Sequence, residues 1–545
     1  MRTQKTLAAV MICAQVALAA DHHGTASSKP AALLKGLGDH HHPIVTRNPP
    51  AQRFFDQGLT LAYGFNHEEA IRSFQRAAEL DPRAVMPLWG IAYALGPDYN
   101  MDVDPDREKK AYETVQKALS LATDAPEHER AYIGAVAKRY SNDPNADLKQ
   151  LNVAYKDAMA DLAKRYPDDL DAATLYAESL MLLRPWKLWN ADGTPAEGTE
   201  LIVATLDGVL QRDPNHPGAN HLFIHAVEAS PHPDWALASA KRLETLVPNA
   251  GHLVHMPSHI YMRTGFYRAA AQSNATAVAV DREYLRTATG LQMYPAMYFS
   301  HNIHFLALAN AMAGRRRDAV AAAKDLYTVV APHALDFPGL VDPLISARFL
   351  VPLRFHDWRE VLSAPEPDSK LAGAHGLWHF ARALAYAGSN DSAGFERERS
   401  AFASERDHLP DNAGFGFNRA ANILRLANVV LDARVAAARG DHATAVSRWE
   451  EAVQVEDTLA YNEPPDWYYP TRESLGAALL AAGRTEDAER VYRKDLEQHP
   501  RNPRSLYGLG LALTAEGKTV AAASVEREFQ VAWKDADVPL KVEDL

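Results

Sequence analysis

The sequence has almost no cysteine, and its single cysteine, Cys13, lies near the amino terminus. The residues around Cys13 are typical of a secretion signal. Arg2 and Lys5 precede a mostly apolar stretch over residues 7–18, and residues 17–19 (Ala-Leu-Ala) form a small-residue cleavage site. Cleavage would remove Cys13. We therefore expect an exported, periplasmic or extracellular protein whose mature chain has no disulfide, no thiolate metal ligand and no cysteine nucleophile.

Positive charge and long apolar runs are also scarce. The formal net charge is −12, from 57 Lys and Arg against 69 Asp and Glu. This balance gives no electrostatic footprint for nucleic acid, so we expect no nucleic-acid partner. The signal stretch is too short to span a bilayer, and no later segment is long and apolar enough. We therefore expect no transmembrane segment.

Familiar catalytic motifs are absent. The sequence has no Walker loop, no G-x-G-x-x-G nucleotide motif and no G-x-S-x-G nucleophile motif. His67, Glu68 and Glu69 begin like the H-E-x-x-H zinc helix, but the second histidine is missing. The two acidic residues suit the positive end of a helix dipole instead. The motifs leave open whether the protein is an enzyme.

What the sequence does contain is a repeat of about 34 residues, the length of a tetratricopeptide (TPR) unit. In residues 51–84, Gly58 and Ala70 would let two helices approach closely, Phe74 would fill the groove to the next hairpin, and Pro82 would end the second helix. The positions that match the TPR pattern are Phe54, Gly58, Leu61, Ala70, Phe74, Ala77 and Pro82.

The same spacing returns towards the C-terminus. It is found in residues 469–502, in a unit from about Leu426, and in a final hairpin from about Pro503. Glycine turns join alanine-rich amphipathic segments elsewhere; they begin at Gly265, Gly314 and Gly440. No stretch has sustained period-two alternation, so we predict no sheet. The predicted fold is all-α, a TPR-like α-solenoid of antiparallel helical hairpins.

The repeats also predict the domain organisation. A repeat array can exceed the size of one compact domain because each unit contacts only its neighbours. The predicted segments are a signal peptide at 1–19, a His-rich leading arm at 20–50, and a solenoid at 51–545, itself divided into N-terminal repeats at 51–170, His-rich central repeats at 171–330, and C-terminal repeats with a cap at 331–545.

The chain has 23 histidines, most densely placed between residues 216 and 304. His221 and His225 are four residues apart, and Glu228 follows three residues later, so on a helix the three share a face. This face belongs to a predicted helix at 221–228, which forms a hairpin with a second helix at about 234–247.

Three more histidines surround the next predicted helix, which we expect to begin at Pro257. His252 is predicted in the approach loop, His255 just before the helix and His259 in its first turn. His304 is three residues after His301 in a further predicted helix at 301–312. First helices of successive TPR units line one concave surface, so these histidines are expected to share a groove.

Several imidazoles and a carboxylate in one groove suit zinc, copper or iron. The candidate ligands are His221, His225, His255 and His259, with His252, His304 and Glu228 as lesser candidates. A site filled by protein ligands would be structural, and one with an open position would activate water or dioxygen. The alternatives are a polar groove for an acidic or aromatic ligand, and a structural pair between Glu228 and Arg263.

A second histidine group, His40 to His42, precedes the first repeat. We expect a free tail that binds metal loosely. The alternative is an arm folded back over the groove.

A proline-rich aromatic segment, residues 463–470, stands at a hairpin entrance, where proline favours extended backbone. Glu463, Trp467 and Arg472 are candidate recognition groups in the groove. The alternative is that the aromatic residues only fill an irregular junction.

Six segments together resemble those of a group of exported bacterial TPR proteins, over nearly the whole mature chain. They are HHHPI, FFDQGLTLAYGFNHEEAIRSF, LWGIAYALGPDYN, NHLFIHAVEAS, AGHLVHMPSHIYMRTGFY and NEPPDWYYPTRESLGAALLAAGR. The resemblance implies export and the TPR fold, and it carries over no catalytic residue.

Two functions follow from these patterns. The first is a TPR protein whose histidine-lined groove holds a transition metal, with metal-assisted oxidation or hydrolysis as the class to test. The second is a metal-free scaffold whose groove binds a protein, a peptide or a small molecule.

Overall fold

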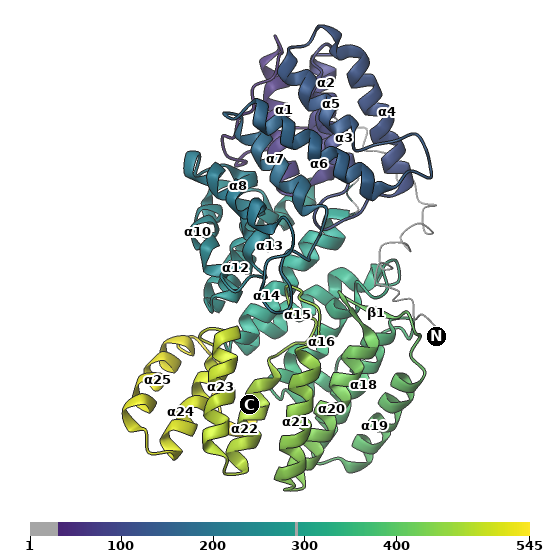
Figure 1. The fold of residues 1–545 in the computed structure, drawn as a ribbon. Coiled ribbons are helices and arrows are strands. Elements are labelled where there is room, and N and C mark those ends of the chain that lie inside the picture. Colours follow the sequence, from purple (N-terminus) through teal and green to yellow (C-terminus); the bar gives the residue numbers. More distant parts are fainter. Residues whose placement is uncertain (1–30, 289–290, 292) are drawn as a thin grey trace, which may run out of the picture. The chain divides into compact units, whose positions relative to one another are not determined.

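The computed structural model describes residues 31–288, 291 and 293–545. The predicted signal peptide and Cys13 lie outside the described residues. The fold is all-α and TPR-like, with consecutive helices packed as antiparallel pairs (Figure 1). The chain forms two compact units. Unit 1 comprises Met1–Pro257 and Ala279–Pro295, and unit 2 comprises Ser258–Val278 and Ala296–Leu545. Neither unit is continuous in sequence.

Unit 1 is built from hairpins in chain order. Its helices are α1 (Pro49–Tyr63), α2 (His67–Leu80), α3 (Met86–Leu95), α4 (Pro105–Leu121), α5 (Glu127–Ala137), α6 (Leu148–Arg165), α7 (Leu170–Met181), α8 (Thr199–Arg212), α9 (Pro217–Val227), α10 (Leu237–Leu246) and α11 (Gly251–His255). Two short 3₁₀ turns, Ala122–Asp124 and Pro233–Ala236, lie between them. Two further helices, α12 (Pro257–Arg263) and α13 (Tyr267–Thr287), have residues in both units.

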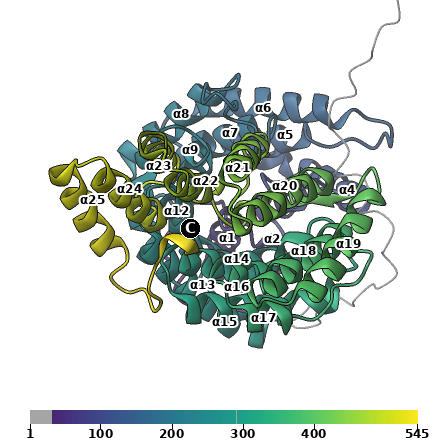
Figure 2. The same ribbon diagram turned by 90° about the horizontal axis from the view of Figure 1, so that it is seen from below.

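Unit 2 continues the same construction. Its helices are α14 (Ser300–Met312), α15 (Arg316–Val330), α16 (Asp342–Arg354), α17 (Trp358–Leu362), α18 (Ala372–Gly388), α19 (Ser392–Asp407), α20 (Ala420–Ala438), α21 (His442–Glu456), α22 (Thr471–Ala481), α23 (Thr485–Gln498), α24 (Pro503–Ala515) and α25 (Thr519–Ala532). A π-helical turn, Pro295–Phe299, precedes α14, and 3₁₀ turns lie at Ala331–His333 and Val542–Asp544. In both ribbon views α24 and α25 lie side by side (Figures 1 and 2).

The predicted hairpins are confirmed. Residues 51–84 form α1 and α2, residues 469–502 form α22 and α23, and residues from Pro503 form α24 and α25. The glycine turns adopt the left-handed conformation that favours glycine, with φ of 77° at Gly265 and 73° at Gly314.

Small residues set the helix spacing, as the pattern predicts. Phe74 is fully buried and packs against Phe55 with ring centroids 5.4 Å apart. A Cβ atom added at Gly58 or at Gly90 would lie 2.6 Å from the Phe74 ring. In unit 2 the Tyr492 ring fits against Gly476 and Gly508 in the same way. An aromatic ring placed against glycines on neighbouring helices therefore recurs in the two units.

The prediction of no sheet is wrong at one place. β1 (Gly414–Phe415) and β2 (Asn418–Arg419) form an antiparallel pair in unit 2. Gly416 turns the chain with φ of 57°, and Asp466 accepts hydrogen bonds from Phe417 N and Asn418 Nδ2. Two residues per strand are too few to produce an alternating pattern, which is why the sequence did not show them.

The tail interpretation of His40 to His42 is wrong for the described residues. Residues 31–48, called the arm below, pack against unit 1. Leu34 N donates to the Gln57 side chain at 2.7 Å, and Asn249 N donates to Gly36 O at 2.9 Å. The arm therefore belongs to the fold of unit 1 and is folded back on it, while its predicted position over the groove stays a prediction.

None of the helices in the described ranges combines the length and the apolar content needed to cross a bilayer.

We expect Gly58→Ala to lower the free energy of unfolding of the protein by about 1–3 kcal/mol, because the new methyl group overlaps the Phe74 ring. The matched control is Gly208→Ala in α8, where an added Cβ meets nothing within 4 Å. Alanine there should stabilise the helix by about 0.5–1 kcal/mol. Urea unfolding of both variants measures the difference, and equal effects would contradict the packing argument.

Candidate functional site

Three buried histidines of unit 1 meet at one point. His221 and His225 lie on α9, and His252 lies on α11. One ring nitrogen of each can be chosen so that the three atoms lie within 4.8 Å of one another. The ring centroid of His221 lies 4.9 Å from that of His225 and 5.0 Å from that of His252. We call His221, His225 and His252 the histidine triad.

Hydrogen bonds orient two rings of the triad. His221 Nδ1 lies 2.5 Å from the backbone oxygen of Tyr63, and His225 Nδ1 lies 2.7 Å from Glu228 Oε1. A carbonyl oxygen and a carboxylate oxygen accept hydrogen bonds, so in both rings Nδ1 carries the proton. Nε2 then carries the lone pair. Metal-binding histidines typically have this arrangement, in which a carbonyl or carboxylate fixes the tautomer and raises the basicity of the ligand nitrogen.

Aromatic side chains surround the triad. The Phe65 ring centroid lies 4.4 Å from that of His221 and 5.6 Å from that of His252. The ring centroid of Tyr99 lies 5.2 Å from that of His225, and the ring centroid of Trp186 lies 5.9 Å from it. Burial, with a further contribution from the charge of Glu228, raises the pKa of Tyr99, so its phenol stays neutral. These aromatic side chains leave little room for water on this side of the triad.

Phe65 is held in a strained conformation beside the triad. Its φ is 55°, in the left-handed region that costs a non-glycine residue about 1–2 kcal/mol. The turn is fixed by hydrogen bonds from Phe65 N to Ala62 O at 3.0 Å and from Asn66 N to Leu61 O at 2.9 Å. Strain of this kind persists where the surroundings determine the conformation, often at functional sites.

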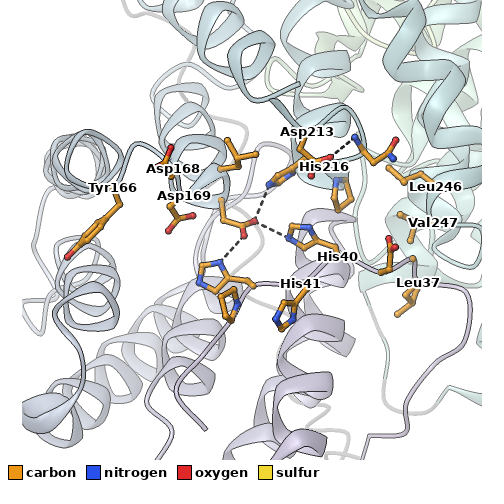
Figure 3. Close-up of a pocket in the computed structure, with 18 of the residues that line it drawn as sticks. Leu37, His40, His41, Tyr166, Asp168, Asp169, Asp213, His216, Leu246 and Val247 are labelled. Atoms are coloured by element: carbon orange, nitrogen blue, oxygen red, sulfur yellow. Dashed lines mark hydrogen bonds and ion pairs between the residues drawn. The ribbon is translucent and has the colours of Figure 1, made fainter. Parts of the chain in front are cut away.

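A second cluster surrounds the carboxylate of Asp171, at the start of α7. Its Oδ1 lies 3.1 Å from His40 Nε2, 3.1 Å from His216 Nε2 and 2.6 Å from the Tyr63 hydroxyl. Its Oδ2 lies 2.8 Å from His42 Nδ1. Figure 3 shows the rings of His40 and His216 directed at this carboxylate. We call Asp171, Tyr63, His40, His42 and His216 the Asp171 cluster.

The tautomer of His216 distinguishes this cluster from the triad. His216 caps α9, and its Nδ1 accepts a hydrogen bond from Ala219 N at 3.1 Å. A neutral His216 therefore carries its proton on Nε2, which donates to Asp171. That nitrogen has no lone pair for a metal. The Asp171 cluster forms a network of hydrogen bonds and ion pairs, and its atoms are also close enough for a metal ion.

The charged groups of the Asp171 cluster stabilise one another in their ionised forms. Burial alone would lower the pKa of His40 and of His42, but the Asp171 carboxylate outweighs this and raises both above the ordinary 6.5. Burial alone would raise the pKa of Asp171, but His40, His216 and His42 hold it well below its usual value. The cluster is therefore an anion beside two imidazoles, those of His40 and His42, that favour the protonated form.

A cavity of about 810 Å³ opens beside the Asp171 cluster (Figure 3). The arm forms one wall through His40 and His41, and residues 165–171 form another. Leu246 and Val247 at the end of α10 contribute an apolar part. The cavity belongs to unit 1 alone, and the arm is one of its walls.

The predicted metal ligands divide between the units. His221, His225, His252, His255 and Glu228 belong to unit 1. The structure joins His252, a lesser candidate, to His221 and His225. The prediction that His252 lies in a loop is wrong, because α11 begins at Gly251. His255 is buried on the same helix, with its ring centroid 5.5 Å from that of His252.

The other two candidates belong to unit 2. His259 is buried on α12, with its ring centroid 4.6 Å from that of Phe305. His304 is buried on α14, and burial lowers its pKa to about 4, so this imidazole is neutral at physiological pH.

The residues proposed for recognition near the C-terminus are buried in their junction. Trp467 packs against Phe380 with centroids 6.0 Å apart. Arg472 donates two hydrogen bonds to Asp457, at 2.8 and 2.6 Å, and Glu463 accepts one from the Tyr461 hydroxyl at 3.0 Å. These contacts favour the alternative in which the segment fills an irregular junction.

Sequence reasoning missed Asp171, Tyr63 and His216. One local signal was available for His216, because a polar residue before Pro217 marks the start of a helix. Asp171 had no signal of its own, since it lies among the first residues of an ordinary helix.

Comparisons with known proteins add little about this site. No family model and no curated protein sequence matches the chain. Many solved structures are similar to it at low identity, among them the following three. The human IFIT1 dimer with PPP-AAAA is 14% identical, with a TM-score of 0.31 over 87% of this chain and 89% of that chain. Yeast Tom70 is 12% identical (TM-score 0.34, 92% and 94%), and the APC/C hetero-tetramer Cut9–Hcn1 is 11% identical (0.27, 92% and 96%). At these TM-scores the likeness carries no argument about function.

We expect Asp171→Asn to lower the free energy of unfolding by about 3 kcal/mol near pH 6, because it leaves buried imidazolium groups without their counter-charge. The loss should be smaller near pH 9. Groups with a raised folded-state pKa, here His40 and His42, stabilise fully below 6.5 and lose that contribution as pH rises through the folded pKa.

Urea unfolding at the two pH values measures this change. Asp168→Asn is the matched control, since the Asp168 side chain is 97% exposed and should have no measurable effect. A loss of stability that is the same at both pH values would contradict the ion-pair description.

Proposed function

We propose that unit 1 binds one transition-metal ion through Nε2 of His221, Nε2 of His225 and a ring nitrogen of His252. The observation that carries this proposal is the orientation of the two α9 rings, whose Nδ1 atoms are directed at Tyr63 O and at Glu228. Zinc, copper and iron all accept imidazole ligands of this kind.

Three protein ligands leave a coordination position open, as is typical of catalytic metal sites. The metal would supply Lewis acidity or redox chemistry there, so hydrolysis or oxidation is the reaction class to test. All three imidazoles are buried, which limits the fourth ligand to a small molecule such as water or dioxygen. Glu228 strengthens His225 as a ligand, and Phe65, Tyr99 and Trp186 exclude bulk water.

The predicted signal at residues 1–19 supports export, and we propose that the metal is acquired outside the cytoplasm. The rival function is a metal-free TPR-like scaffold for a protein or peptide. Helical hairpin arrays offer extended surfaces for such partners. Metal content separates the two proposals.

We expect the protein, produced without a histidine tag and supplied with zinc, copper or iron, to retain about one metal ion per chain. His221→Ala/His225→Ala should abolish this content. His232→Ala is the matched control, because His232 follows α9 but is exposed and stacked on Trp235. Elemental analysis after gel filtration is the measurement, and circular dichroism confirms folding. Absence of metal in the wild type, or equal content in the double variant, would contradict the proposal.

Glu228→Gln should weaken metal affinity by about 10–100-fold, the usual effect of removing a carboxylate that orients a ligand histidine. Glutamine keeps the size of the side chain and an acceptor oxygen but loses the charge. Competition with a chelator measures the dissociation constant. An unchanged constant would show that Glu228 has a purely structural role.

A further inference from the structure

Two histidines and several backbone amides of the arm contact the helices of unit 1. His40 and His42 contact Asp171, and His42 N donates to Asp56 Oδ1 at 3.2 Å. Ile44 N donates to Gln52 Oε1 at 2.9 Å, and Val45 N donates to Glu129 Oε1 at 2.6 Å. These three amides connect the arm to α1 and α5, as Leu34 N also does through Gln57.

Asp171 also anchors the segments that orient the triad. The Tyr63 hydroxyl donates to Asp171, while the backbone oxygen of Tyr63 accepts from His221. His216, at the start of α9, donates to Asp171 and lies five residues before His221. One carboxylate therefore connects the arm, the end of α1 and the start of α9.

Acidic groups dominate around the two arm histidines. His40 faces Asp171, His216 and Tyr63, with Asp56 and His42 further away. His42 faces Asp171, Asp169, His128 and Tyr132, again with Asp56 further away. His128 and Tyr132 both contact Asp169, at 2.7 Å each. Protonation of His40 and His42 therefore strengthens the attachment of the arm.

We propose that the arm is a pH-dependent latch, closed when His40 and His42 are protonated on Asp171, and that closing it raises the affinity of the histidine triad for its metal. The effect on metal affinity rests on the proposed function, whereas the pH-dependent attachment of the arm does not.

The direction of the pH dependence follows from the charges around His40 and His42. Burial opposes protonation of His40 and His42, but Asp171 raises the pKa of both above 6.5. The latch is therefore fully closed below about pH 6.5 and loosens as the pH rises through the folded values. Asp171 stays ionised over this range, because the surrounding imidazoles hold its pKa well below its usual value although burial opposes this.

The first experiment needs no metal. Hydrogen exchange of the Ile44 and Val45 amides is measured in the metal-free protein near pH 6 and near pH 8.5, as protection factors corrected for the intrinsic rate. We expect protection to fall by at least about fivefold at the higher pH. In His40→Gln/His42→Gln it should be the same at both values, because glutamine keeps a donor but does not titrate. Constant protection in the wild type would overturn the latch, even where the double variant does not fold.

The second experiment tests the coupling. Co(II) affinity is measured by its absorption spectrum at the same two pH values. The dissociation constant of the double variant should exceed that of the wild type about tenfold near pH 6 and approach it near pH 8.5. His42→Gln alone should show a smaller change with the same sign.

The control is His41→Gln, in the middle of the same tripeptide. The His41 side chain is 57% exposed and contacts Asp56 rather than Asp171, so both readouts should match the wild type. An affinity ratio that is the same at both pH values would overturn the coupling, because a purely structural role of the arm gives a constant ratio. Absence of Co(II) binding in the wild type would overturn the proposed function and with it the coupling. The latch itself is then decided by the hydrogen-exchange experiment alone.

Discussion

The buried carboxylate of Asp171 is the constraint on which the rest of unit 1 depends. A carboxylate taken out of water is costly unless donors and opposite charges surround it. Asp171 receives three imidazoles and one phenol, which come from the arm, α1 and α9. Removing any one of these donors leaves the carboxylate less well compensated. The requirement to satisfy it therefore fixes the positions of the arm and α1 relative to α9, which is distant from both in sequence.

Histidines a short distance apart at the start of α9 and within it have different roles. His216 presents Nδ1 to a backbone N–H, which puts its proton on Nε2 and makes it a donor to Asp171. His221 and His225 present Nδ1 to acceptors, which leaves the lone pair on Nε2. The partner of one ring nitrogen thus decides whether an imidazole is suited to stabilise an anion or to bind a metal. Counting histidines cannot make that distinction.

The hairpins were predictable because their signals are local. Gly58, Phe74 and Pro82 act within one repeat, and the i, i+4 spacing of His221 and His225 places them on one face. His252 joins them only through the packing of α11, and Asp171 meets His40 across 131 positions of sequence. The arm looked like a tail because its composition is polar and two of its acceptors, Glu129 and Asp171, lie far along the chain.

The turn after α1 connects the ordinary chemistry of a repeat with the proposed metal site. Asn66 caps α2 by accepting from Glu69 N at 3.3 Å, and this cap defines where the turn ends. The turn carries Tyr63, whose carbonyl orients His221, and Phe65, whose ring packs on the triad. A change in this turn must alter the orientation of a ligand and the packing around it together. The cap of α2 is thereby part of the geometry of the proposed site, so under that proposal stability and metal affinity vary together here.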